Sequence, residues 1–440
     1  MIKLNPENPQ ELQQLLHAGM GRAILFLMNQ VTSQYRDVIL DECLHDYSYE
    51  SPCEDNAVYL YPLLKASGEL EYYRDAILGA LPESENKYDT QQLLDFAVLF
   101  ARDGYQQART AIYDRLRSST GELRCGYDQA IELDGISGLI SCLELLSSDP
   151  GVLEPYEYDC MLEAAEGITS VDEVRLALIE AARENPSVAR TLAGIKHYSP
   201  EWSEDEILDK REERRQCLFD TDEIITEETT WEEVKSSSEF RSLVFPWRRL
   251  ACDSEFEKAA YDLDIDADPK LLASFLLLFE KRPFPMDPDK LIQLVDHLDE
   301  KVACRALTAL RNVHHPDVRA LFARIVKHPE LSYRAVELIQ SNYETGDDKV
   351  IMHLLETESD QENLHKLCID VMNTYSANPT PEGMDPLLLV YELDPCSVCR
   401  NKCIKTIQTL GELPDWMIEE CRYDSDSGTR EIAEMLSGSS

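Results

Sequence analysis

The sequence predicts an all-α protein, an α-solenoid of stacked antiparallel helical hairpins. Two observations predict this class. In the C-terminal part, an apolar residue is followed four, seven and eight positions later by further apolar or small residues, which is the spacing of one helix face. This pattern recurs, and its starting residues are 31, 29, 33, 35 and 30 residues apart. The starting residues are Leu271, Val302, Leu331, Leu364, Cys399 and Thr429.

A second helix is expected between successive patterned helices. These segments are 287–298, 315–328, 346–358, 380–393 and 413–424. Each has a Pro, Gly or Asp as its first or second residue, and these residues break the preceding helix and start or cap the next one. The predicted unit is therefore a helical hairpin, repeated roughly five times with a terminal cap.

The stretch "DEKVACRALTALRNVHHPDVRALFARIV", which begins at Asp299, resembles a HEAT repeat. The family usually carries Arg directly after the Val, whereas this sequence has Arg305 three positions after Val302. The resemblance covers residues 256–440. It implies a HEAT-like solenoid and a binding scaffold, because such arrays mostly serve to hold partners and their fold does not fix an activity.

The N-terminal half repeats less regularly. "YRDVIL" at 35–40 returns as "YRDAIL" at 73–78. The segment 93–116 resembles a tetratricopeptide unit, which is also a helical hairpin, and 171–183 resembles a HEAT helix. We therefore expect residues 1–200 to form an N-terminal helical-repeat region.

Residues 201–255 break the period and are expected to form an acidic, irregular linker or insertion between this region and the C-terminal HEAT-like region, 256–440. The segment 201–235 contains 14 acidic and 5 basic residues, which is typical of a solvated linker. "SEDE" and "TWEE" resemble capping boxes and predict short helices. The alternative is an acidic interaction arm joined to "FPWRRL", in which Trp247, Arg248 and Arg249 would anchor an interface.

Charge bounds the function. The chain has 84 acidic and 42 basic residues, a formal charge of −42. Such a field repels phosphate backbones, so direct nucleic-acid binding is not expected, and no Lys/Arg-rich block supplies a basic face. The acidity either keeps the protein soluble or attracts a basic protein partner.

The sequence has no apolar run long enough for a membrane span, and its start lacks the order of a secretory signal, so a cytoplasmic location is expected. An odd count of 13 cysteines argues against a disulfide framework.

The stretch "DPCSVCRNKCIKT" contains Cys396, Cys399 and Cys403 in a C-x₂-C-x₃-C arrangement. In the repeat register, Cys399 and Cys403 fall on positions that other units fill with core Val, Leu and Ala. A tetrahedral zinc site would need a fourth ligand; Cys421 is the next candidate, and no His follows His365. We interpret the cysteines as core residues, and a metal or redox site is the alternative.

Other candidate ligands are interpreted as loop, cap or packing residues. His314, His315 and His328 fall in predicted turns, and the acidic runs 261–269 and 424–428 do not complete an EF-hand. The paired tyrosines are expected to pack between helices, with a concave groove as the alternative. These paired tyrosines are Tyr59 with Tyr61 and Tyr72 with Tyr73. We therefore expect no catalytic, cofactor-binding or metal-ligating residues and no cofactor.

The favoured hypothesis is a non-catalytic scaffold or adaptor that binds a partner, expected to be basic, on an acidic solenoid surface. A specific version is an inhibitor or immunity-type protein that masks a cationic nucleic-acid-binding enzyme. A second class is a lyase-type enzyme or enzyme subunit, since some HEAT-like proteins resemble bilin lyases; it requires a cleft that collects His and acidic residues. The third is a rigid adaptor whose acidity only provides solubility. The oligomeric state is not predicted.

Overall fold

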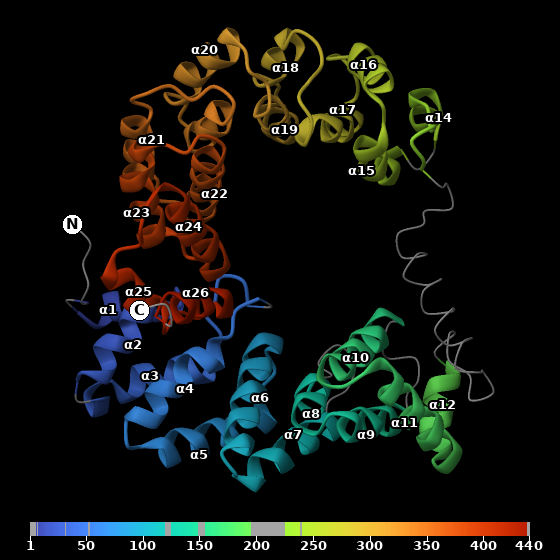
Figure 1. Ribbon diagram of the computed structural model, residues 1–440, viewed down its shortest axis with the longest axis vertical. Coiled ribbons are helices and arrows are strands. Elements are labelled where there is room, and N and C mark those ends of the chain that lie inside the picture. Colours follow the sequence, from blue (N-terminus) through green and yellow to red (C-terminus); the bar gives the residue numbers. More distant parts are fainter. Residues whose placement is uncertain are drawn as a thin grey trace. The chain divides into compact units, whose positions relative to one another are not determined.

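The computed structural model describes residue 6 and residues 8–30, 32–51, 53–118, 125–147, 155–194, 225–237 and 240–437. Over these residues the protein is all-helical and has no strand, which confirms the predicted all-α class. The chain divides into two compact units, one of residues 3–217 and 418–440 and the other of residues 218–417. Figure 1 labels the helices of both units.

The first unit is built around one hydrophobic core that its helices share. Helix α6 packs against α3, α4, α7 and α8. Its apolar residues Leu93, Phe96 and Phe100 recur at helical spacing and are buried. The α-helices of this unit are α1 (Pro9–His17), α2 (Gly21–Met28), α3 (Arg36–Leu44), α4 (Asn56–Ala66), α5 (Leu70–Ala80), α6 (Lys87–Arg102), α7 (Gln106–Ser118), α8 (Tyr127–Asp134), α9 (Ile136–Leu146), α10 (Pro155–Ile168), α11 (Val171–Glu184), α12 (Pro186–Gly194) and α26 (Ser427–Ser437).

The C-terminal end of the chain packs on the N-terminal helices inside this unit. The buried Arg22 side chain in α2 donates to Glu420 Oε2, with Nη2 at 2.9 Å. A Cβ atom added at Gly21 would lie 1.9 Å from the Glu420 carbonyl oxygen, so the two segments touch through backbone. The Ser425 N–H also donates to the Gly19 carbonyl. The repeat pattern gave no indication of this contact between residues about 400 positions apart.

The second unit contains the segments in which the repeat pattern is clearest. Its α-helices are α14 (Trp231–Ser236), α15 (Phe240–Leu250), α16 (Asp253–Tyr261), α17 (Pro269–Leu276), α18 (Asp289–Leu294), α19 (Glu300–Leu310), α20 (Pro316–Ile325), α21 (Asp348–Thr357), α22 (Gln361–Ala377), α23 (Met384–Leu393) and α24 (Ser397–Leu410). Helix α25 (Asp415–Cys421) begins in this unit and ends in the first one. Within the described residues, the 3₁₀ segments are η1 (Thr32–Tyr35), η2 (Leu81–Glu83), η4 (Leu277–Glu280), η5 (Ser332–Ile339) and η6 (Pro381–Gly383).

Most positions of the predicted core faces of this unit are buried, but the starting residues Leu331, Leu364 and Cys399 are only partly buried. Val302, Ala306 and Leu310 in α19 each have a relative exposure of 0%. Leu271 was expected in the core but is 51% exposed, because it lies in the first turn of α17 before the buried stretch begins. The patterned helix expected after Leu331 is the 3₁₀ segment η5 and not an α-helix.

Side-chain bonds in the second unit recur at one sequence separation. Residues 29 positions apart are joined by Thr308 Oγ1 to Glu337 Oε2 at 3.0 Å, by His365 Nδ1 to Asp394 Oδ1 at 2.9 Å and by Lys402 Nζ to Asn373 Oδ1 at 2.6 Å. These residues, 29 positions apart in the sequence, therefore lie next to each other. This spacing agrees with the periods read from the sequence.

The described part of the predicted linker contains short helices. The capping box at "TWEE" is confirmed, since Thr230 and Glu233 exchange side-chain and backbone hydrogen bonds at the start of α14. The other predicted box, "SEDE", lies outside the described residues. The alternative interface anchor is wrong for Trp247, whose ring is fully buried and whose Nε1 donates to the Thr229 carbonyl at 2.9 Å. Arg248 is buried as well and donates to the Leu277 carbonyl.

The helices of the described segments are all too short or too polar to cross a membrane. Every cysteine in the described ranges is free.

Candidate functional site

The candidate binding site is formed by the C-terminal end of α3 and the first turn of α6. Gln92, a buried residue of α6, holds the two elements together. Its Nε2 donates to the Glu42 carbonyl at 2.7 Å and to the Cys43 carbonyl at 3.0 Å. These carbonyls lie at the end of α3, where no further helical N–H is available. Asn56 donates in turn to Gln92 Oε1 at 2.6 Å, so the amide is fixed in one orientation.

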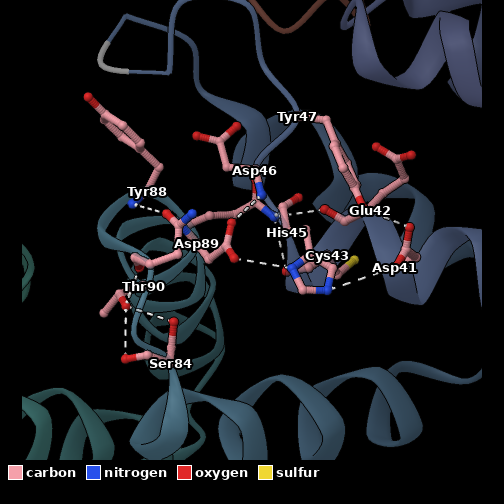
Figure 2. A network of polar contacts seen from close by, with 12 residues as sticks. Asp41, Glu42, Cys43, His45, Asp46, Tyr47, Ser84, Tyr88, Asp89 and Thr90 are labelled. Atoms are coloured by element: carbon pink, nitrogen blue, oxygen red, sulfur yellow. Dashed lines mark hydrogen bonds and ion pairs between the residues drawn. The ribbon is translucent and has the colours of Figure 1, made fainter.

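His45 lies between two carboxylates, as Figure 2 shows. Its Nδ1 is 3.1 Å from Asp89 Oδ2, and its Nε2 is 4.0 Å from Asp41 Oδ1. His45 caps the C-terminal end of α3, and Asp89 lies in the first turn of α6. A helix C-terminus favours a cation and a helix N-terminus favours an anion, so both helix dipoles favour this pair. The Asp46 N–H also donates to Asp89 Oδ1 at 2.9 Å.

A second histidine completes the arrangement from α1. His17 Nε2 lies 2.9 Å from Glu42 Oε1, and the His17 ring stacks on Tyr47 with the centroids 4.2 Å apart. Burial raises the pKa of Glu42 above its ordinary value, while the hydrogen bond and charge of His17 act in the opposite direction. Tyr47 donates to Asp41 Oδ2 at 3.1 Å. Burial and that carboxylate raise the pKa of Tyr47 to about 12.

We call these residues the acid–histidine cluster. It consists of His17, Asp41, Glu42, His45, Asp46, Tyr47 and Asp89. Four carboxylates face only two histidines, and no Lys or Arg of the described ranges pairs with them. The cluster therefore has more acidic than basic side chains. The Asp41 side chain is 43% exposed, and Tyr47 and neighbouring Tyr88 are 39% and 47% exposed. Exposed carboxylates beside aromatic faces suit Lys and Arg side chains.

The structure brings two of the three motif cysteines together with a histidine. Cys403 is fully buried and donates to the Leu387 carbonyl, as expected of a core residue. Cys399 is only partly buried and faces α22, where His365 Nε2 lies 3.9 Å from its Sγ. Cys396 caps α24, and its Sγ accepts the Cys399 N–H at 3.4 Å. Neighbouring Cys396, burial and Asp394 raise the pKa of Cys399.

The sequence contained a signal for this histidine that was not used. In the sequence pattern, His365 follows Leu364, the starting residue that precedes Cys399 in the series, and the structure places His365 and Cys399 side by side. Cys421, the expected fourth candidate, belongs to the other compact unit.

The remaining candidates are cap, loop or packing residues, as predicted. His315 Nδ1 accepts the Asp317 N–H at the start of α20. Asp268 caps α17, and Asp426 Oδ1 accepts the Thr429 N–H at 2.7 Å. Tyr59 is buried and donates to the Met20 carbonyl at 2.9 Å.

One hollow of the second unit is basic, which the sequence did not predict. A hollow of about 350 Å³ is lined by Arg241, Lys270, Lys301 and Arg305, with Asp299 as its acidic residue. The four cationic side chains come from three separate stretches of chain, so they form no basic block in the sequence. No described carboxylate forms an ion pair with any of them. Arg305 donates instead to the Ala273 carbonyl.

No known protein family matches this chain, and no curated protein does. Among solved structures, it is similar to an engineered protein known from its crystal structure. The identity is 11% and the TM-score 0.22, over 96% of this chain and 98% of that chain. A likeness this low carries no argument about fold or function.

Proposed function

We propose that this protein is a cytoplasmic, non-catalytic scaffold that binds a basic protein partner at the acid–histidine cluster. The proposal includes the finer fold, an α-solenoid of HEAT-like and tetratricopeptide-like hairpins. Side-chain bonds that recur at a separation of 29 residues support such stacking. Extended arrays of this kind commonly present binding surfaces.

The observation that carries the proposal is the uncompensated charge of the cluster. Its carboxylates are held in place by protein contacts and have only histidines as counter-cations. A Lys or Arg from a partner would supply the missing positive charge without reorganising the site. The overall charge of −42 would accelerate its approach.

The test is recovery of partners from a lysate of the native host by the immobilised full chain, at low and at high salt. The test variant is the Asp41→Asn, Asp46→Asn pair, which removes two charges and keeps side-chain volume. The matched control is the Glu180→Gln, Glu184→Gln pair in α11, which removes two exposed charges far along the chain.

One dominant basic protein should be recovered at low salt and lost at high salt. The test variant should lose it, and the control should retain it. Equal recovery by both variants would overturn the assignment to this cluster. A recovered cationic nuclease or nucleic-acid-binding enzyme that is inhibited by the chain would establish the inhibitor version of the proposal.

A second candidate function rests on the basic hollow. Its four cationic side chains, which have no described carboxylate partner, fit a small anionic ligand, whereas the cleft of His and acidic residues that the lyase-type alternative requires is a different kind of pocket. Calorimetric titration with inorganic phosphate tests it. Binding that disappears in Arg305→Gln and persists in Arg324→Gln, an exposed arginine of α20, would support this candidate; no heat of binding to the unaltered chain would remove it.

A further inference from the structure

One histidine nitrogen and two cysteine sulfur atoms lie close together between α22 and α24. The Nε2 or Nδ1 of His365 and the Sγ atoms of Cys396 and Cys399 all lie within 4.8 Å of one another. No other group of His, Cys, Asp or Glu in the described segments meets this condition. Side chains of two adjacent hairpins meet here, because 34 residues separate His365 from Cys399.

The distance between the histidine nitrogen and the Cys399 sulfur is close to that of two ligands of a tetrahedral zinc ion. With Zn–S near 2.3 Å and Zn–N near 2.1 Å, two ligands of one tetrahedral zinc lie about 3.6 Å apart for N and S and about 3.8 Å for S and S. The observed distance from His365 Nε2 to Cys399 Sγ is 3.9 Å. For this pair, coordination of a zinc ion requires shifts of only a few tenths of an ångström, and the Cys396 Sγ lies within 4.8 Å of both atoms.

The surroundings orient the ligands as they do in known metal sites. The other ring nitrogen of His365, Nδ1, contacts Asp394 Oδ1 at 2.9 Å, and the Asp394 side chain is fully buried. A hydrogen bond from Nδ1–H to this carboxylate selects the tautomer whose lone pair is on Nε2, and carboxylate–histidine pairs of this kind accompany zinc ligands. Asp394 Oδ1 also accepts the Cys396 N–H at 3.0 Å, so one carboxylate positions two of the three ligands.

We propose that His365, Cys396 and Cys399 bind one zinc ion, with a water molecule or an external ligand at the fourth position. Two thiolates and an imidazole select a soft or borderline cation over Mg²⁺ or Ca²⁺. The site is open on the histidine side, since His365 is 14% exposed whereas Cys396 is 2% exposed. The inference is independent of the acid–histidine cluster, which lies in the other unit.

The first test is the metal content of the full chain after expression with added zinc and removal of loosely bound ions. Cys399→Ser and His365→Gln are the ligand variants. Cys403→Ser, from the same motif, and Cys252→Ser, at an exposed position, are matched controls that each remove one thiol. The unaltered chain and both controls should contain one zinc per chain, and both ligand variants should lose it.

Cobalt provides a readout that does not depend on stoichiometry alone. Co²⁺ added to the zinc-free chain should give the intense visible bands of tetrahedral coordination and a near-ultraviolet thiolate-to-cobalt band, and Cys399→Ser should weaken the latter. Asp394→Asn should lower the zinc affinity by about 10- to 100-fold, the effect usual for a group that orients a ligand. A chelator competition measures this change.

The proposal is overturned if the unaltered chain, supplied with zinc, contains none. It is also overturned if the Cys403→Ser control loses zinc while His365→Gln keeps it, because the ligand set would then be different. Isolation of a Cys396–Cys399 disulfide in a metal-free chain prepared under reducing conditions would show a redox pair instead.

Discussion

Replacing Glu337 by Gln tests whether buried charges hold successive hairpins of the second unit together. The Glu337 side chain in η5 is fully buried. Its Oε1 lies 2.6 Å from Arg334 Nη2 and 2.9 Å from Lys366 Nζ, a residue of the next hairpin. Its Oε2 accepts from Thr308 Oγ1, a residue of the preceding one. One carboxylate thus joins α19, η5 and α22.

The expected loss follows from what the substitution leaves behind. Removing one partner of a buried ion pair costs about 3–5 kcal/mol, because the remaining charge stays desolvated. Arg334 is buried, but Lys366 is 32% exposed and keeps Asp370 as a partner. We therefore expect a loss near the lower end of that range, about 3 kcal/mol in the free energy of unfolding.

The pH dependence supplies a second check. Burial alone would raise the pKa of Glu337, but Lys366 and Arg334 outweigh it and hold the pKa below its ordinary value. A carboxyl group of this kind adds stability above its unfolded pKa of about 4.3 and loses that contribution as pH falls through the lower folded pKa. The difference in free energy of unfolding between the variant and the unaltered chain should therefore be largest at pH 7 and decrease in acid.

Urea unfolding followed by circular dichroism measures the loss, and hydrogen exchange of the η5 peptides locates it. The matched control is Asp296→Asn, which breaks an exposed pair with Arg324 and should cost no more than about 1 kcal/mol. If Glu337→Gln costs no more than this control, the carboxylate does not join the hairpins and the reasoning fails.

Three further predictions concern other parts of the chain. Burial raises the pKa of Asp95 to about 7 from 3.8, so its ionisation should lower stability as pH rises from about 4 to 7; Asp95→Asn should flatten that slope in urea titrations. Gly21→Ala should lower the free energy of unfolding by about 1–3 kcal/mol, because the added methyl group overpacks against the C-terminal segment. Gly79→Ala, at an open helical position, should raise the free energy of unfolding by about 0.5–1 kcal/mol in the same assay. Thr230→Ala should cost about 1 kcal/mol by loss of the α14 cap, seen as faster hydrogen exchange in 231–236.

The sequence predicts helices and their buried faces well where one period governs both. In α19, the spacing of Val302, Ala306 and Leu310 is a local property, and the burial of all three follows from it. Leu271 fails because spacing alone does not say at which residue a helix enters the core. The prediction of an α-helix at η5 fails for a related reason, since apolar residues three and four positions apart fit both an α-helix and a 3₁₀ helix.

The acid–histidine cluster was beyond this reasoning because its members come from three elements without a shared period. His17, His45 and Asp89 meet only after α1, α3 and α6 have packed, and Gln92 fixes that packing through main-chain carbonyls. Nothing in the local pattern distinguishes these acids from the many other acidic residues of the chain.

The proximity of His365 to Cys396 and Cys399 could have been predicted from the sequence, because in repeat arrays residues one period apart come into contact. Once the hairpins are aligned, any residue near position i of one unit lies beside position i plus about 30 of the next. Applied to Cys399, this rule selects Leu364 and His365, and applied to His365 it selects Asp394. In a compact zinc finger the paired ligands are close together in the sequence, and the prediction considered only pairs of that kind. Here His365 lies beside Cys399 from 34 residues away, so the absence of a partner nearby in the sequence says little about a metal site.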